Sequence, residues 1–183
     1  TAEELELMMT TPLHNARLYI IRDLFLFSCY TGISYGDMCL LTKDDLVTDE
    51  NGTLWIRTSR KKTKVEYEVP LLEVPLHILS KYRDVEPNGK LLPMYCNSDV
   101  NKYLKTIATK CGINRRIVFH AARHTYATEI TLSHGVPLET VSKMLGHTRV
   151  DTTQIYAKVT DDKINADTKR LDNKISERFT IAI

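Results

Sequence analysis

Apolar residues recur at helical spacing along most of the chain, and alternate with polar residues in only one short region. Apolar positions three and four residues apart form one face of an α-helix, whereas strict alternation is typical of a half-buried strand. The helical pattern predicts helices over residues 1–10, 11–32, 35–41, 74–85, 98–112, 119–133 and 138–145, a small helix carrying Tyr156, and a final helix lined by Ile164, Leu171 and Ile175. Pro12 lies near the start of the second helix and Gly32 past its end, as helix termini favour.

The alternating region predicts a β-hairpin. Residues 53–59 (TLWIRTS) and 65–71 (VEYEVPL) are rich in β-branched and aromatic residues, and the second segment alternates cleanly. Between them, residues 60–64 (RKKTK) give the hairpin a positively charged tip, and Asn51 with Gly52 marks the turn before it. We therefore predict a mainly α fold with a small antiparallel β-sheet (α+β).

The composition is that of a globular protein without a membrane span. The 183 residues are 43% hydrophobic and 26% charged, and the longest apolar stretch is interrupted by Arg22 and Asp23. No signal peptide is evident, so we expect a cytoplasmic, nucleoid-associated protein with no membrane partner. Four cysteines lie far apart with no C-x-x-C pair, which favours reduced thiols over zinc or a disulfide framework.

Positive charge is concentrated in two segments. Residues 57–64 hold five basic residues and no acidic one, and residues 100–128 hold six and none, while the rest of the chain holds 14 basic and 23 acidic residues. The net charge of +2 hides this segregation. Although each segment alone could be an ordinary solvated face, together they favour a surface that binds a polyanion such as DNA.

His120 and Arg123 are the first candidates for chemistry. Three residues apart on a helix, they share a face, and an imidazole beside a guanidinium suits a phosphate. His124, four residues after His120, raises the possibility of a metal pair. Because no third ligand stands at a familiar spacing and Arg123 would repel a cation, we favour phosphate and expect no metal.

The segment GHTRVDTTQIYAK places Tyr156 nine residues after His147. With His120 and Arg123 as H-x-x-R, LGH at residues 145–147, Tyr156, and KTKVEYEVPL carrying Lys62, the chain resembles the tyrosine recombinase (phage-type integrase) family. The pattern is closest to integrases of Bacteroides-type mobile elements. The resemblance covers nearly the whole chain and implies that family's catalytic-domain fold.

The resemblance also implies a mechanism without a cofactor. Tyr156 would attack a DNA phosphodiester and form a 3′-phosphotyrosyl bond, Arg123 and His147 would hold the nonbridging oxygens, Lys62 would protonate the 5′ oxygen, and His120 would assist at the tyrosine. The family's first arginine is replaced by Ser34, with Asp37 at the acidic position of the same motif. We expect Arg60 to substitute, since it lies two positions from Lys62 on a regular strand, with Arg22 as second candidate.

The resemblance and the basic segments together predict the partners. Arg57, Lys61, Lys64, Lys102, Arg115 and Arg116 are expected to contact double-stranded DNA. We expect residues 1–183 to form one catalytic domain, the C-terminal part of a longer integrase whose core-binding domain is absent. We also expect a monomer without DNA and a homo-tetramer on paired sites, in which residues 179–183 are exchanged between protomers.

Two other functions remain open from the sequence. Residues 127–147 resemble a helix-turn-helix, with residues 136–145 as recognition helix, so a non-catalytic DNA-binding regulator is one alternative. That alternative leaves Lys62 and the spacing from His147 to Tyr156 without a role. A type IB topoisomerase would share the tyrosine chemistry but relax supercoils without exchanging strands.

Overall fold

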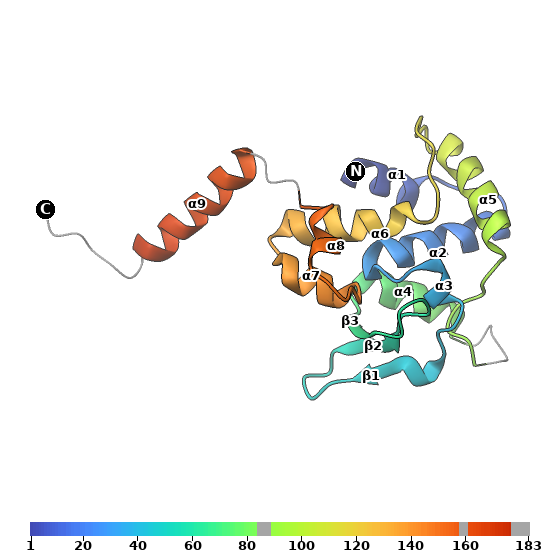
Figure 1. Ribbon diagram of the computed structural model, residues 1–183. Coiled ribbons are helices and arrows are strands. Elements are labelled where there is room, and N and C mark those ends of the chain that lie inside the picture. The colour runs from blue at the N-terminus through green and yellow to red at the C-terminus, as the bar shows by residue number, and fades with distance from the viewer. Residues whose placement is uncertain (84–88, 158–160, 177–183) are drawn as a thin grey trace, which may run out of the picture.

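The computed structural model describes residues 1–83, 89–157 and 161–176. Helix α2 (Ala16–Thr31) runs through the middle of the molecule and the other elements pack around it (Figure 1). Ten of its 16 residues are buried, including both phenylalanines, so its pattern is that of a core helix. The helix begins after Asn15, whose side chain accepts the amide N–H of Arg17, and the predicted start near Pro12 is therefore wrong.

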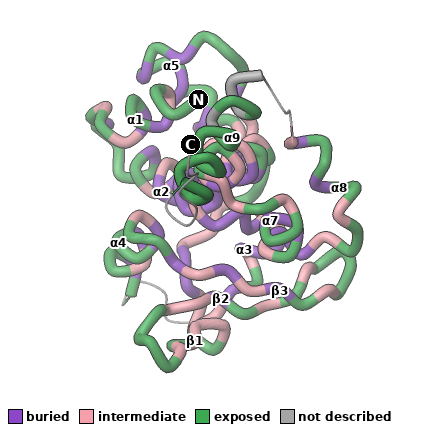
Figure 2. The backbone as a smooth tube through the Cα atoms, turned by 90° about the vertical axis from the view of Figure 1, so that its left-hand side faces the viewer, coloured by how far each residue is buried: buried purple, intermediate pink, exposed green. Residues whose placement is uncertain are grey.

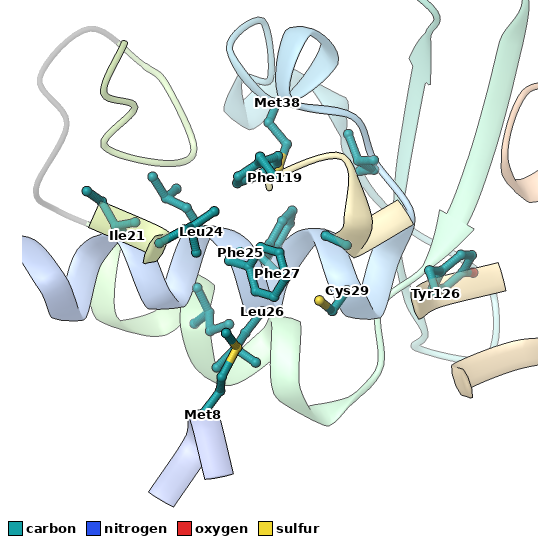
Figure 3. Packing of buried hydrophobic residues seen from close by; sticks show 14 of the residues in the cluster. Met8, Ile21, Leu24, Phe25, Leu26, Phe27, Cys29, Met38, Phe119 and Tyr126 are labelled. Atoms are coloured by element: carbon teal, nitrogen blue, oxygen red, sulfur yellow. The ribbon is translucent and has the colours of Figure 1, made fainter. Parts of the chain in front are cut away.

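Four helices pack around α2. They are α1 (Ala2–Thr10), α4 (Glu73–Tyr82), α5 (Asn97–Lys110) and α6 (Ala121–Thr125). Figure 3 shows the core at close range, with Phe25 and Phe27 of α2 between Met8 of α1 and Phe119 from the segment before α6. Figure 2 shows the buried residues concentrated along α2 and its neighbours, so α2 is the scaffold for the loops at its C-terminal end.

A three-stranded antiparallel sheet lies beside the helices, in the order β1 (Leu46–Thr48), β2 (Leu54–Ser59) and β3 (Glu66–Pro70). Its β2–β3 pair is the predicted hairpin, with Ile56 opposite Val69 and both buried, whereas β1 was not predicted. A short 3₁₀ turn, η1 (Lys43–Asp45), precedes it. The prediction of a mainly helical fold with a small antiparallel sheet is confirmed.

The segment after α6 leaves regular α-helical geometry. A π-helix, η2 (Tyr126–Thr131), continues α6 directly and ends in a 3₁₀ turn, η3 (Leu132–His134). α7 (Leu138–Met144) and α8 (Asp151–Gln154) follow, and Tyr156 lies in the turn immediately after α8 rather than within it. π-Helical segments are frequent near functional sites because they change the direction of side chains along a helix.

The last described helix, α9 (Asp161–Ser176), projects from the rest of the molecule in Figure 1, while the side chain of its Arg170 lies beside Gly135. Its apolar residues Ile164, Leu171 and Ile175 are exposed, at 51%, 58% and 46%. The predicted exchanged tail, residues 179–183, lies outside the described residues. None of the helices in the described ranges has the length and apolar character needed to cross a membrane.

Candidate active site

Arg123 is the buried centre of the site. Only 3% exposed, it donates from Nη1 to the carbonyl oxygen of Gly32 (2.7 Å) and from Nη2 to that of Leu145. Burial, and next the charge of Arg60, lower the pKa of Arg123 to about 10, so the guanidinium remains charged at neutral pH. A guanidinium has five N–H donors, so Arg123 keeps donors for an anion after bonding these two carbonyls.

Arg60 enters the same site from the end of β2. Its Nη1 lies 3.0 Å from Oδ2 of the buried Asp37, but this buried nitrogen makes no aligned hydrogen bond within the described part of the chain. The side chain crosses Gly146 so closely that a Cβ there would lie 2.8 Å from Cγ of Arg60. Arg60 thus lies against the backbone between Leu145, whose carbonyl oxygen Arg123 binds, and His147, and its positive charge lowers the pKa values of Arg123 and His147.

Asp37 organises this part of the site. Its carboxylate accepts the hydroxyl of Ser34 (2.8 Å) and the backbone N–H of Lys61 (2.9 Å), in addition to its pairing with Arg60. Ser34, which stands where the resemblance expects an arginine, caps the short helix α3 (Tyr35–Met38). Asp37 therefore links the base of the basic hairpin to Ser34, the residue that replaces the family's first arginine.

His147 follows α7 and is half-buried. Burial, then the charges of Arg123 and Arg60, lower the pKa of His147 to about 4, so its ring is neutral at physiological pH. Its Nδ1 lies 2.8 Å from the hydroxyl oxygen of Thr153, a fully buried residue of α8. The sequence did not single out Thr153, because a lone threonine carries no local signal that its hydroxyl will hydrogen-bond to His147, six residues earlier.

Tyr156 packs against α6, the helix that carries Arg123. Its side chain is 8% exposed. Its ring meets the ring of His124 edge to face, with centroids 4.8 Å apart, and His124 meets His120 in the same way at 5.3 Å. His124 therefore lies between the tyrosine and His120.

This order of rings adds a residue that the sequence did not assign to the site. His120 was expected to assist at the tyrosine, and the ring in contact with Tyr156 is that of His124, which in turn contacts His120. Burial, and then the charges of His120 and Arg123, lower the pKa of His124 and favour its neutral form. Within the described residues no three His, Cys, Asp or Glu side chains form a group suited to a metal ion.

A cavity of about 440 Å³ opens beside these groups. Ser34, His120 and Arg123 line one side, and Arg116 lies on its wall together with the N-terminal residues of α5. Because the side chain of Ser34 is short, it does not fill this space as an arginine at this position would. Two guanidinium groups, those of Arg116 and Arg123, are part of the cavity lining, which suits a phosphate.

Lys62 lies at the exposed tip of the hairpin. β2 ends at Ser59, and residues 61–63 form a turn that is closed by the N–H of Lys64 donating to the carbonyl oxygen of Arg60 (2.8 Å). The argument that Arg60 and Lys62 share one strand face is therefore wrong, since Lys62 is not in a strand. Arg60 reaches the site because Asp37 and the space over Gly146 direct its side chain there.

Arg22 does not take part in the site. Its Nη1 donates to the carbonyl oxygens of Met8, Met9 and Thr11, and its guanidinium stacks over Tyr19 at 4.8 Å. It thus caps the C-terminus of α1, about 15 Å along α2 from Gly32 at 1.5 Å per residue. The second candidate for the missing arginine is therefore excluded by its position.

The residues expected to contact DNA divide into two groups. Arg57 and Arg115 are already paired, Arg57 with Glu68 (3.1 Å) and Arg115 with Glu4 through two nitrogens. The second pair lowers the pKa of Glu4 to about 2. The others form no ion pair with an acidic side chain of the described residues: Lys61, Lys64 and Lys102, which are exposed, and Arg116, which lines the cavity.

Replacing Arg116 and its neighbour Arg115 by alanine should have different consequences. Arg116→Ala is expected to reduce the slope of log Kd against log salt by about one unit, since each phosphate contact contributes about 0.9 to that slope. Arg115→Ala should leave the slope unchanged and loosen the contact between α1 and the domain. Binding isotherms at several salt concentrations measure both slopes, and equal slopes for the two variants would contradict the distinction.

Comparison with known proteins agrees with this geometry. The model of the phage integrase family matches residues 1–163, which is most of the chain. The chain belongs to the phage integrase family. A tyrosine recombinase of Thermosipho africanus (strain TCF52B) is 30% identical over 141 residues, which cover 73% of this chain and 48% of that protein. The chain therefore spans about half the length of this curated relative.

Solved structures of integrase-family proteins share the fold. The match with the crystal structure of the XerA recombinase covers 99% of this chain and 65% of the XerA chain, with a TM-score of 0.70 and 23% identity. A second match is the XerH site-specific recombinase bound to its difH substrate in a pre-cleavage complex. It covers 91% of this chain and 52% of the XerH chain, with a TM-score of 0.71 and 22% identity. At these identities the likeness establishes the fold of the integrase catalytic domain.

Proposed function

We propose that this chain is the catalytic domain of a site-specific DNA recombinase that cleaves and rejoins double-stranded DNA through a 3′-phosphotyrosyl intermediate, during integration and excision of a mobile element. The observation that carries the proposal is the position of Tyr156, whose buried ring packs on His124, the residue after the buried Arg123 in α6. Arg60 and His147 lie on either side of Gly146 at the same end of the domain, where Arg123 binds the carbonyl oxygen of Leu145. A tyrosine placed beside two guanidiniums and a neutral imidazole suits attack on a phosphodiester.

Cleavage forms one bond and breaks one. The hydroxyl oxygen of Tyr156 bonds to phosphorus while the bond from phosphorus to the 5′ oxygen breaks. Arg123, Arg60 and His147 donate hydrogen bonds to the nonbridging oxygens, whose negative charge grows as the tyrosine attacks. The tyrosine proton passes to the adjacent His124 and from there to His120, and both histidines are exposed at the edge of the site. The phosphotyrosyl bond keeps the bond energy for rejoining, so the reaction needs neither a metal nor a nucleotide.

Lys62 is proposed as the acid that protonates the departing 5′ oxygen. The hairpin tip is exposed, and DNA laid over the site would bring the ammonium and the scissile phosphate together. Lys62→Ala should slow cleavage of ordinary DNA but have little effect on a substrate with a 5′-bridging sulfur, because a thiolate leaves without protonation. Single-turnover rates on the two substrates measure this.

Lys61→Ala is the matched control for Lys62. Its side chain is exposed on the same turn, and its structural contact is the backbone N–H to Asp37, which alanine retains. Lys64 is a poorer control because its φ of 60° is unfavourable for alanine. If Lys62→Ala slows both substrates equally, Lys62 only positions the DNA.

Double-stranded DNA and further copies of the same chain are the proposed partners. The basic hairpin tip and the basic wall of the cavity supply the DNA surface. The exposed apolar residues Ile164, Leu171 and Ile175 of α9 lack a covering element within the described structure, which favours packing against a neighbouring protomer when two sites are paired as a tetramer.

A nicked suicide substrate tests the proposed function. Cleavage next to the nick releases a short 5′-hydroxyl fragment that diffuses away, so the covalent complex accumulates and is resolved by denaturing electrophoresis. We expect an adduct on the 3′ end of the cleaved strand. A DNA-binding regulator built on α7 would give no adduct, and a topoisomerase would form the adduct but relax supercoiled DNA without exchanging strands between paired sites.

A further inference from the structure

Thr153 connects two parts of the site that are separate in the sequence. Its side chain is fully buried, and its hydroxyl oxygen lies 2.8 Å from Nδ1 of His147. Its carbonyl oxygen accepts the backbone N–H of Tyr156 at 3.0 Å. One residue thus contacts the histidine and also holds the turn that carries the tyrosine.

The direction of this hydrogen bond follows from the needs of the buried hydroxyl. Among the described residues, Nδ1 of His147 is the hydrogen-bond partner of this hydroxyl. If Nδ1 carried the proton and donated it, the hydroxyl hydrogen of Thr153 would stay unpaired in the core, and buried polar groups are rarely left so. The hydroxyl therefore donates to Nδ1, and the single proton of the neutral ring is on Nε2.

We propose that Thr153 is a positioning residue that fixes the tautomer of His147, so that His147 offers an Nε2–H donor to the scissile phosphate. This inference rests on the proposal that a phosphodiester binds beside Arg123. Because Nδ1 is held by Thr153, only Nε2 is available to a ligand. The other tautomer would turn a lone pair toward a phosphate oxygen and repel it. Because Thr153 also binds the backbone N–H of Tyr156, a shift of the turn that carries Tyr156 would also move the hydroxyl that fixes the tautomer of His147.

The tautomer of the His147 ring is measured directly in the DNA-free protein, by nitrogen NMR of protein labelled with ¹⁵N-histidine. The His147 resonances are assigned as those that disappear in His147→Asn. We expect the Nε2–H form. Thr153→Val, which keeps the shape and removes the hydroxyl, should shift His147 toward the Nδ1–H form, whereas Thr153→Ser should restore Nε2–H. Thr152→Val changes an exposed neighbour and should leave the spectrum unchanged.

Cleavage rates complete the test. Thr153→Val should slow adduct formation by about 100-fold, the lower range for loss of one aligned donor, with recovery in Thr153→Ser. An Nδ1–H tautomer in the wild-type protein, an unchanged tautomer in Thr153→Val, or a changed tautomer without a change in rate would each overturn the inference. Adducts that persist in Tyr156→Phe would instead refute the proposed function, and leave the tautomer result intact.

Discussion

Replacing Tyr156 by phenylalanine is expected to abolish the covalent DNA adduct while leaving DNA affinity unchanged. Phenylalanine preserves the buried ring and its edge-to-face contact with His124, and removes only the hydroxyl oxygen that attacks phosphorus. Arg123, Arg60 and the basic hairpin, which are proposed to bind the phosphates, are not altered. The adduct is measured on the suicide substrate and the affinity by titration of intact DNA.

Tyr103→Phe is the matched control for this loss. Its hydroxyl accepts a hydrogen bond from Arg17 (2.8 Å) at the surface of α5, so its removal tests the loss of a tyrosine hydroxyl away from the site. Tyr103→Phe should form the adduct at the wild-type rate. An adduct that survives in Tyr156→Phe means that another residue is the nucleophile, and the proposed mechanism would be wrong.

Replacing Arg60 by alanine is expected to slow cleavage by roughly 10²–10³-fold, the usual effect of removing one preorganised donor from a charged transition state. Arg60 pairs with Asp37 and lies against Gly146, and we propose that it replaces the family's first arginine. Arg60→Lys should recover little, because an ammonium keeps the charge but loses the two-pronged geometry. Single-turnover rates at saturating DNA give these effects.

The second variant in this test is Ser34→Arg. In the Arg60→Ala background it places a guanidinium next to Asp37 and should restore much of the lost rate. Because Arg60→Ala leaves the buried Asp37 without its cation, thermal unfolding must be measured alongside, and Arg60→Lys provides a variant that keeps a charge there. Arg22→Ala should retain cleavage, since Arg22 caps α1. Wild-type cleavage by a folded Arg60→Ala variant would show that the site works with one arginine.

The helices, the hairpin and the main site residues could be predicted because local pattern and motif spacing determine them. The alternation in residues 65–71 gave β3, with Tyr67 and Val69 buried. Separate motifs along the chain predicted a site of His120, Arg123, His147 and Tyr156. Their actual proximity arises from packing of α6, α7 and the turn after α8 near the end of α2.

Features that depend on side-chain partners could not be predicted. Arg60 was chosen from strand parity, but the turn at residues 61–63 invalidates that reason, and it is the buried Asp37 that directs the side chain. Arg115 and Arg116 look equivalent as neighbours in a basic segment, yet Glu4, more than 100 residues away in sequence, engages only Arg115. Long-range ion pairs of this kind leave no local signal.

Identifying the amino acid that carries DNA in the covalent complex tests the central claim most directly. The complex trapped on the suicide substrate is digested with trypsin, and the DNA-linked peptide is sequenced by mass spectrometry. We expect the peptide of residues 150–158, VDTTQIYAK, with the 3′ end of the cleaved strand on the oxygen of Tyr156. DNA on any other peptide, or attachment through a 5′ end, would contradict the account.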